Sequence, residues 1–175
     1  MATMILLPDG TGVTSVDWVA VGETYRHQCL DDDNDGTSYV KCDDNNETMI
    51  IEYANPPVAE SNIDTIDTVN FVSVGKSSHR SSPSVVSISF EAPAGVSGYP
   101  ELCSYDAHRS NYETINGTAR ATKDGTHDWD YAALESLEMI CIKTFAVEVY
   151  LSYLALEVTY TAGVTDNATF FGANF

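Results

Sequence analysis

The sequence predicts an all-β fold: an antiparallel two-sheet sandwich, jelly-roll-like, with one or two short helices. Apolar and polar residues alternate with a period of two in most apolar segments, which is the pattern of half-buried strands. Turn-forming residues interrupt the chain at short intervals, as at Pro8–Gly10, Asn55–Pro57, Ala94–Pro100 and Asp124–Gly125. No segment carries the long apolar stripe of an amphipathic helix.

The segment Ser84–Phe90 is the most regular of the predicted strands. Val86, Ile88 and Phe90 fall on one face, and serines occupy most of the other. Prolines bracket the segment on both sides, where they do not interrupt a hydrogen-bonded ladder. We therefore expect one buried and one exposed face.

The segment Ile63–Val74 is predicted to form a longer strand. Its inward-facing residues are expected to be Ile66, Val69, Phe71 and Val74. The alternation slips by one residue near Asp67-Thr68, so we expect a β-bulge there. Shorter strands are predicted at residues 37–42 and 48–53.

The segment Phe145–Tyr160 is the most apolar predicted strand. Its first half places Phe145, Val147, Val149 and Leu151 on one face. Its second half has the opposite parity, with Leu154, Leu156, Val158 and Tyr160 on one face. Because a slip of one residue turns every side chain to the other face, we predict a bulge or a tight bend near Ser152-Tyr153.

Helix is expected in two places only. Trp129–Leu137 is predicted to form two short turns that begin at Thr126 or Asp128 as the N-cap. Glu23–Leu30 is a second candidate.

The length of 175 residues fits one domain, with a β-sandwich at residues 1–160 and a C-terminal extension at residues 161–175. The extension carries Phe170, Phe171 and Phe175 on a backbone of small residues. It is either a frayed tail or an arm whose phenylalanines dock on a neighbouring subunit, since exposed aromatic side chains mark contacts.

The charge excludes several classes of partner. The chain has a formal net charge of −18 and only 8 lysines and arginines, which are scattered. We therefore expect no nucleic-acid binding, which needs a basic face, and no binding to an anionic membrane surface. The first eight residues have no basic n-region, so no signal peptide is expected, and no stretch is long enough to span a membrane.

The four cysteines, Cys29, Cys42, Cys103 and Cys141, match no zinc-site spacing. Without an export signal, we expect them to be reduced and mostly buried.

An acidic run is the one candidate metal site. Asp31, Asp33 and Asp35 occupy positions 1, 3 and 5 of a calcium-loop pattern, with Gly36 at position 6. Position 12 is Cys42 instead of the bidentate glutamate. The alternative is an acidic turn before a strand, in which Asp and Asn bond their own backbone. We expect no cofactor, and calcium at these three aspartates remains the competing hypothesis.

No motif points to an enzyme. His108 could combine with Asp106 and a serine, but Gly95–Gly98 is not a nucleophile elbow and such combinations arise by chance. Paired carboxylates are abundant, yet a two-carboxylate glycosidase site depends on spatial spacing. Trp18, Trp129 and the ten tyrosines could stack on sugars, although the same residues fill sandwich cores.

Three segments resemble virion structural proteins of tailed bacteriophages. They are Pro8–Gly10 followed by Trp18, the acidic run and strand at Asp31–Val40, and the closing pair Val147–Leu151 and Leu156–Tyr160. Together they span roughly residues 4–160, and the aromatic extension lies outside the resemblance.

The resemblance implies a non-enzymatic jelly-roll protein of the virion, most directly a capsid decoration (cement) protein that stabilises the outer shell. It implies the major capsid protein or other virion proteins as partners, a homo-oligomer for which a trimer is expected, and a place on the outer surface of the virion after synthesis in the host cytoplasm. The alternatives are a tail or appendage component and a glycan-binding host-attachment module. No catalytic residue carries over.

Overall fold

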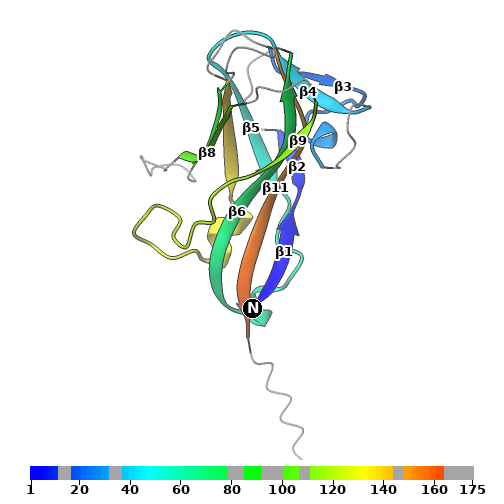
Figure 1. Ribbon diagram of the computed structural model, residues 1–175. Coiled ribbons are helices and arrows are strands. Elements are labelled where there is room, and N and C mark those ends of the chain that lie inside the picture. Colours follow the sequence, from blue (N-terminus) through cyan, green and yellow to red (C-terminus); the bar gives the residue numbers. More distant parts are fainter. Residues whose placement is uncertain are drawn as a thin grey trace, which may run out of the picture.

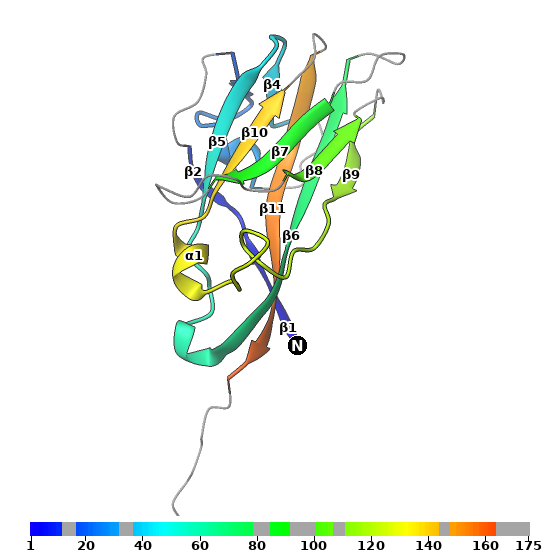
Figure 2. The same cartoon turned by 90° about the vertical axis from the view of Figure 1, so that its left-hand side faces the viewer.

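Two antiparallel sheets pack face to face in the computed structural model, which confirms the predicted all-β sandwich (Figures 1 and 2). The structure describes residues 1–11, 17–31, 37–78, 85–91, 101–106, 111–143 and 148–163, with the backbone alone for residues 11, 85–91 and 101–106. None of the helices in these ranges is long and apolar enough to cross a membrane.

Within these ranges the first sheet has six strands. Its order is β3 (Val19–Val21), β4 (Tyr39–Cys42), β11 (Val149–Ala162), β6 (Ile63–Ser77) and β9 (Glu113–Asn116), and β1 (Ala2–Leu6) also pairs with β11. The second sheet follows the order β2 (Pro8–Thr11), β5 (Glu47–Tyr53), β10 (Glu138–Lys143), β7 (Val85–Glu91) and β8 (Glu101–Asp106). The predicted strands at residues 37–42, 48–53, 63–74 and 84–90 therefore all form.

The pairing of β11 with β6 confirms both predicted bulges. Successive partners step from Leu151 to Tyr153 on β11, so Ser152 is an extra residue opposite a continuous β6. On β6 the partners step from Thr68 to Ile66, which leaves Asp67 as the extra residue. Each bulge resets the alternation, so the apolar side chains on both sides of it face the core.

The Ser152 bulge also divides the free side of β11 between two partners. Before the bulge, residues 149–151 pair with β4, and after it residues 156–160 pair with β1. Between them the amide of Leu154 donates to the carbonyl oxygen of Leu30 at 2.9 Å. One strand thereby organises most of the first sheet.

The core lies between the two sheets and takes side chains from both. Among the described residues, the largest fully buried side chains are Trp18, Phe71, Lys143, Leu6, Leu30, Met49, Ile51, Leu134, Met139 and Leu151. Lys143 is the exception among these apolar groups. Its ammonium group donates to the backbone oxygen of Asp44, and desolvation lowers the pKa of Lys143.

Three local predictions need correction. The helix α1 spans only Tyr131–Glu135 and its N-cap is Asp130, not Thr126 or Asp128. The segment 23–30 forms only a 3-10 turn, η1 (His27–Cys29), and a second 3-10 turn is η2 (Glu60–Asn62). Val74 is buried, but regular alternation from Phe71 places it on the opposite face of β6.

The cysteine prediction holds for the side chains described. Cys29, Cys42 and Cys141 are free and buried, and the side chain of Cys103 lies outside that part of the structure. Desolvation raises the pKa of Cys42 to about 11 and also raises that of Cys141. Because the thiolate is the reactive form, these two thiols are poor nucleophiles.

Candidate functional site

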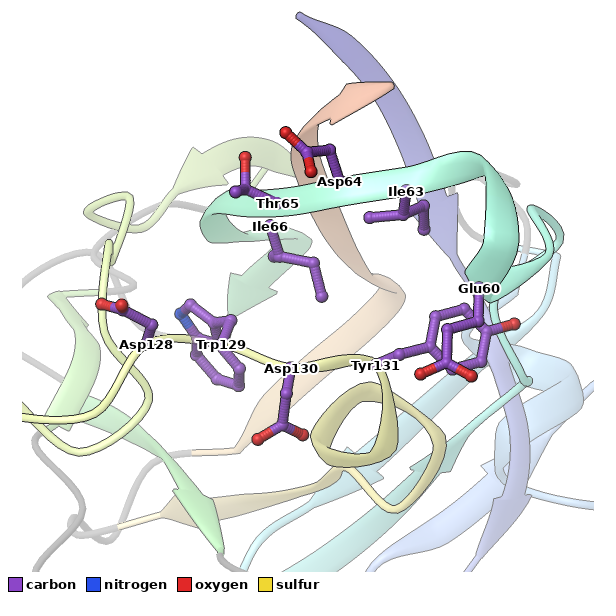
Figure 3. Close-up of a pocket in the computed structure, with 9 residues that line it drawn as sticks. All are labelled: Glu60, Ile63, Asp64, Thr65, Ile66, Asp128, Trp129, Asp130 and Tyr131. Carbon is purple, nitrogen blue, oxygen red and sulfur yellow. The ribbon is translucent and has the colours of Figure 1, made fainter. Parts of the chain in front are cut away.

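A pocket of about 360 Å³ opens between the start of β6 and the segment that leads into α1 (Figure 3). Its lining residues are Glu60, Ile63, Asp64, Thr65, Ile66, Asp128, Trp129, Asp130 and Tyr131. Ile66 and Trp129 are buried and form the floor. Each of the four carboxylate residues is exposed, so they form a rim.

The segment 122–128 sets the position of one wall. A bridge between Thr122 and Asp128 and the bond from the amide of Lys123 to the oxygen of His127 close this loop. Inside the loop, one Asp124 oxygen accepts hydrogen bonds from the amides of Thr126 and His127 at 2.9 and 2.7 Å. These backbone bonds and the adjacent His127 ring lower the pKa of Asp124.

The two aromatic residues of the pocket are held by hydrogen bonds to backbone oxygens. The indole Nε1 of Trp129 donates to the oxygen of Arg120 at 3.0 Å, and Arg120 is bridged to Val69 of β6. The hydroxyl of Tyr131 donates to the oxygen of Val58 at 3.1 Å. In Figure 3 the side chain of Ile66 points from β6 toward this aromatic pair. Hydrogen bonds to two separate backbone segments therefore fix the positions of both aromatic side chains.

Asp130 has a structural role at the rim. One carboxylate oxygen accepts from the amide of Ala133 at 2.7 Å and caps α1, and the other contacts the ammonium of Lys123 at 2.6 Å. The bond from Lys123 is the main cause of a lowered Asp130 pKa, and the Ala133 amide lowers it further. Asp130 is thus held ionised, which suits an acceptor of hydrogen bonds and not a general acid.

A second cluster of polar and aromatic side chains lies on the outer face of the first sheet. Lys76 on β6 places its ammonium 4.4 Å from the ring centre of Tyr112 and 5.0 Å from that of Tyr150. The ring of Tyr39 meets that of Tyr150 edge-on at 5.5 Å. Such contacts stabilise neighbouring strands across the sheet. The Lys76 ammonium lies over two of the rings and the Tyr150 hydroxyl donates to the Glu148 carboxylate, so we assign the cluster a structural role.

Of the three aspartates in the predicted calcium site, the structure describes only Asp31. Asp31 is half-buried, and Asp33 and Asp35 lie outside the described residues. Cys42, at position 12 of the calcium-loop pattern, faces the core, where its thiol contacts the oxygen of Asp44. No group of three or more potential ligands that could hold a metal occurs in the described ranges.

The other predicted site residues are divided between the core and undescribed segments. Trp18 is fully buried in the core, and Trp129 lies in the pocket floor. Phe170, Phe171, Phe175 and His108 lie outside the described residues. The pocket itself was missed, and its one sequence signal is the alternation of acidic and aromatic residues at 128–131.

Comparisons with known proteins give no family assignment. No family model matches the chain, and no curated protein matches it. Among solved structures, the chain is similar to the N-terminal cellulose-binding domain of β-1,4-glucanase C from Cellulomonas fimi, with 13% identity over 84% of this chain and 89% of that chain. The TM-score is 0.36, which is too low to support an argument about function.

The N-cap at the pocket rim gives a testable stability effect. We expect Asp130→Ala to lower the free energy of unfolding by about 1 kcal/mol at pH 7, because the Ala133 amide loses its partner. Asp130→Asn retains an oxygen acceptor and should lose less. Because the Asp130 pKa is lowered on folding, its stabilisation is present above about pH 4 and is lost as the pH falls below that value.

Urea denaturation at pH 7 and pH 3 measures this effect. The difference between the original protein and Asp130→Ala should shrink at pH 3. A difference that is the same at both pH values would contradict an ionised cap.

Proposed function

We propose that the chain is a non-enzymatic structural protein of a tailed-bacteriophage virion, acting as a capsid decoration protein on the outer shell. Its partners are the major capsid protein and further copies of itself, with a trimer as the expected oligomer. Contacts made across joints between capsid subunits stabilise the shell by mass action, because they bind only the assembled state.

One observation supports this proposal most directly. Two of the three segments that carry the phage resemblance meet in the fold, because Val40 lies opposite Leu151 where β4 pairs with β11. The remaining segment, Pro8–Gly10, lies on β2 in the second sheet (Figure 1). The pairing of β4 with β11 is the contact that a shared sheet framework would provide.

The charge and the reactive groups agree with such a role. A net charge of −18 keeps particles that display many copies apart in solution. At the pocket rim Asp130 is held ionised, and the buried thiols of Cys42 and Cys141 have raised pKa values. None of these three groups is therefore suited to act as a general acid or as a nucleophile.

The number of copies per particle tests the proposal. Quantitative mass spectrometry of purified particles should find the protein in numbers comparable to the major capsid protein. A few copies per particle would assign it to a tail or vertex instead. Its absence from particles that are otherwise complete would refute the virion role.

The pocket favours oligosaccharide binding as a second candidate function, which would serve host attachment. Exposed carboxylates around a buried floor of Ile66 and Trp129 place hydrogen-bond acceptors around an apolar surface. Sugars present hydroxyl donors at their edges and C–H groups on their faces. A volume of about 360 Å³ lies in the range of small-molecule sites.

Glycan arrays followed by calorimetry test this second function. We expect Asp128→Asn to weaken the binding of a retained oligosaccharide about tenfold or more, because a hydrogen bond to a charged group contributes about 1.5–3 kcal/mol. Glu135→Gln removes the same charge from an exposed position on α1 outside the pocket lining and should have no effect. Equal losses in both variants, or no binding on the array, would exclude the pocket as a glycan site.

A further inference from the structure

The large exposed apolar side chains of the described residues belong to two short stretches of the chain. The large ones that are most exposed are Met1, Ile5, Leu7, Val19 and Tyr25. They belong to β1, β3 and the residues that flank these strands. Since β6 occupies the other side of β11, β1 and β4 lie on the same side of that strand, and β3 continues from β4 (Figure 1). These residues therefore follow one edge of the first sheet.

β1 has an open hydrogen-bonding edge. All five of its residues pair with β11, and no strand of the described ranges pairs with its other side. Natural edge strands are protected by charges, prolines or bulges, but Met1–Leu7 has no charged side chain and no proline, and its register with β11 is regular. Met4 and Leu6 face the core, while Ile5 is 44% exposed. An uncharged, half-apolar edge on a chain of net charge −18 is suited to receiving another strand.

We propose that this edge binds the C-terminal segment, residues 164–175, of a neighbouring copy by antiparallel strand addition. The segment has one acidic side chain, Asp166, so the acidic surface repels it little. Its Val164, Phe170, Phe171 and Phe175 provide apolar side chains for contact with Ile5 and Leu7. The inference deepens the proposed structural role by naming the contact between copies.

The exit point of the chain favours a neighbouring copy over the same one. β11 ends at Ala162, and its residue Tyr160 is paired with Ala2 at the start of β1. A segment that leaves at this point and turns onto the free side of its own β1 would run parallel to it and would have to pass across β1. A segment from another copy can approach in the antiparallel direction, which is the more stable pairing. Twelve extended residues reach about 40 Å, which is sufficient to span a subunit joint.

Photo-crosslinking of the full chain tests the contact. One batch carries p-benzoylphenylalanine in place of Ile5, and it is mixed with an isotopically labelled batch of the original sequence. Mass spectrometry should find residue 5 joined to residues 164–175 of a labelled copy. Crosslinks to the same copy, to β1 of another copy, or to no segment of the chain would overturn the proposal.

Sedimentation analysis gives an independent measurement. We expect the full chain to self-associate and Ile5→Lys to weaken association about tenfold or more. Thr114→Lys is the matched control, because it adds the same charge at an exposed position of β9, on the opposite edge of the first sheet, and it should associate like the original chain. Thr3→Lys repeats the test at a second exposed position of β1 if thermal melting shows that Ile5→Lys does not fold.

Two results would refute the proposed strand addition. One is a monomer at all concentrations, and the other is a Thr114→Lys variant whose self-association is weakened as much as that of Ile5→Lys. Crosslinking and sedimentation test the contact between purified copies, whereas the particle copy number tests the virion role. A negative result in one test therefore does not decide the other.

Discussion

The one-residue offset at Ser152 is the constraint on which the first sheet depends. β11 has to present Val149 and Leu151 to the core before that point and Leu154, Leu156 and Val158 after it. These two sets have opposite parity, so a regular strand would expose one of them. The bulge resolves the conflict by leaving Ser152 without a partner on β6. Its hydroxyl is buried and has no hydrogen-bond partner among the described residues, which is a cost that the burial of both apolar sets offsets.

Several other features follow from this strand. The bulge separates the residues that pair with β4 from those that pair with β1, and the amide between them bonds to Leu30. β1 is thereby held on one side only, which leaves the uncharged edge proposed as the contact between copies. Near the far end of β11, its partner β6 begins with the residues that form one wall of the pocket. The framework, the edge and the pocket thus share the β6–β11 pair.

The elements that sequence predicts well are those whose signal is local. Both bulges follow from a change of parity within a few residues, at Ser152 and at Asp67. The helix cap was misplaced because Thr126, Asp128 and Asp130 are all competent caps within one short stretch. Only the folded chain shows that Asp124 organises the loop before them and that Asp130 reaches the Ala133 amide.

The pocket and the outer-face aromatic cluster are non-local and could not be predicted in the same way. The pocket joins Ile66 to Trp129, and the cluster joins Tyr39 to Tyr150, so each depends on which strands become neighbours. The alternation of apolar residues within a strand does not determine which strands become its neighbours. The calcium hypothesis at Asp33 and Asp35 and the aromatic arm remain predictions, since those residues lie outside the described part.

A pair of deletions tests the central claim most directly. Removing Ser152 should leave a regular ladder with every core residue in place, so this variant should unfold cooperatively and retain most of its stability. Removing Glu157, which is not at a bulge, forces at least two of the apolar residues Leu154, Leu156, Val158 and Tyr160 out of the core, and should cost about 3 kcal/mol or more. Chemical denaturation of both variants gives the comparison. A Ser152 deletion that is as destabilising as the Glu157 deletion would contradict the role assigned to the bulge.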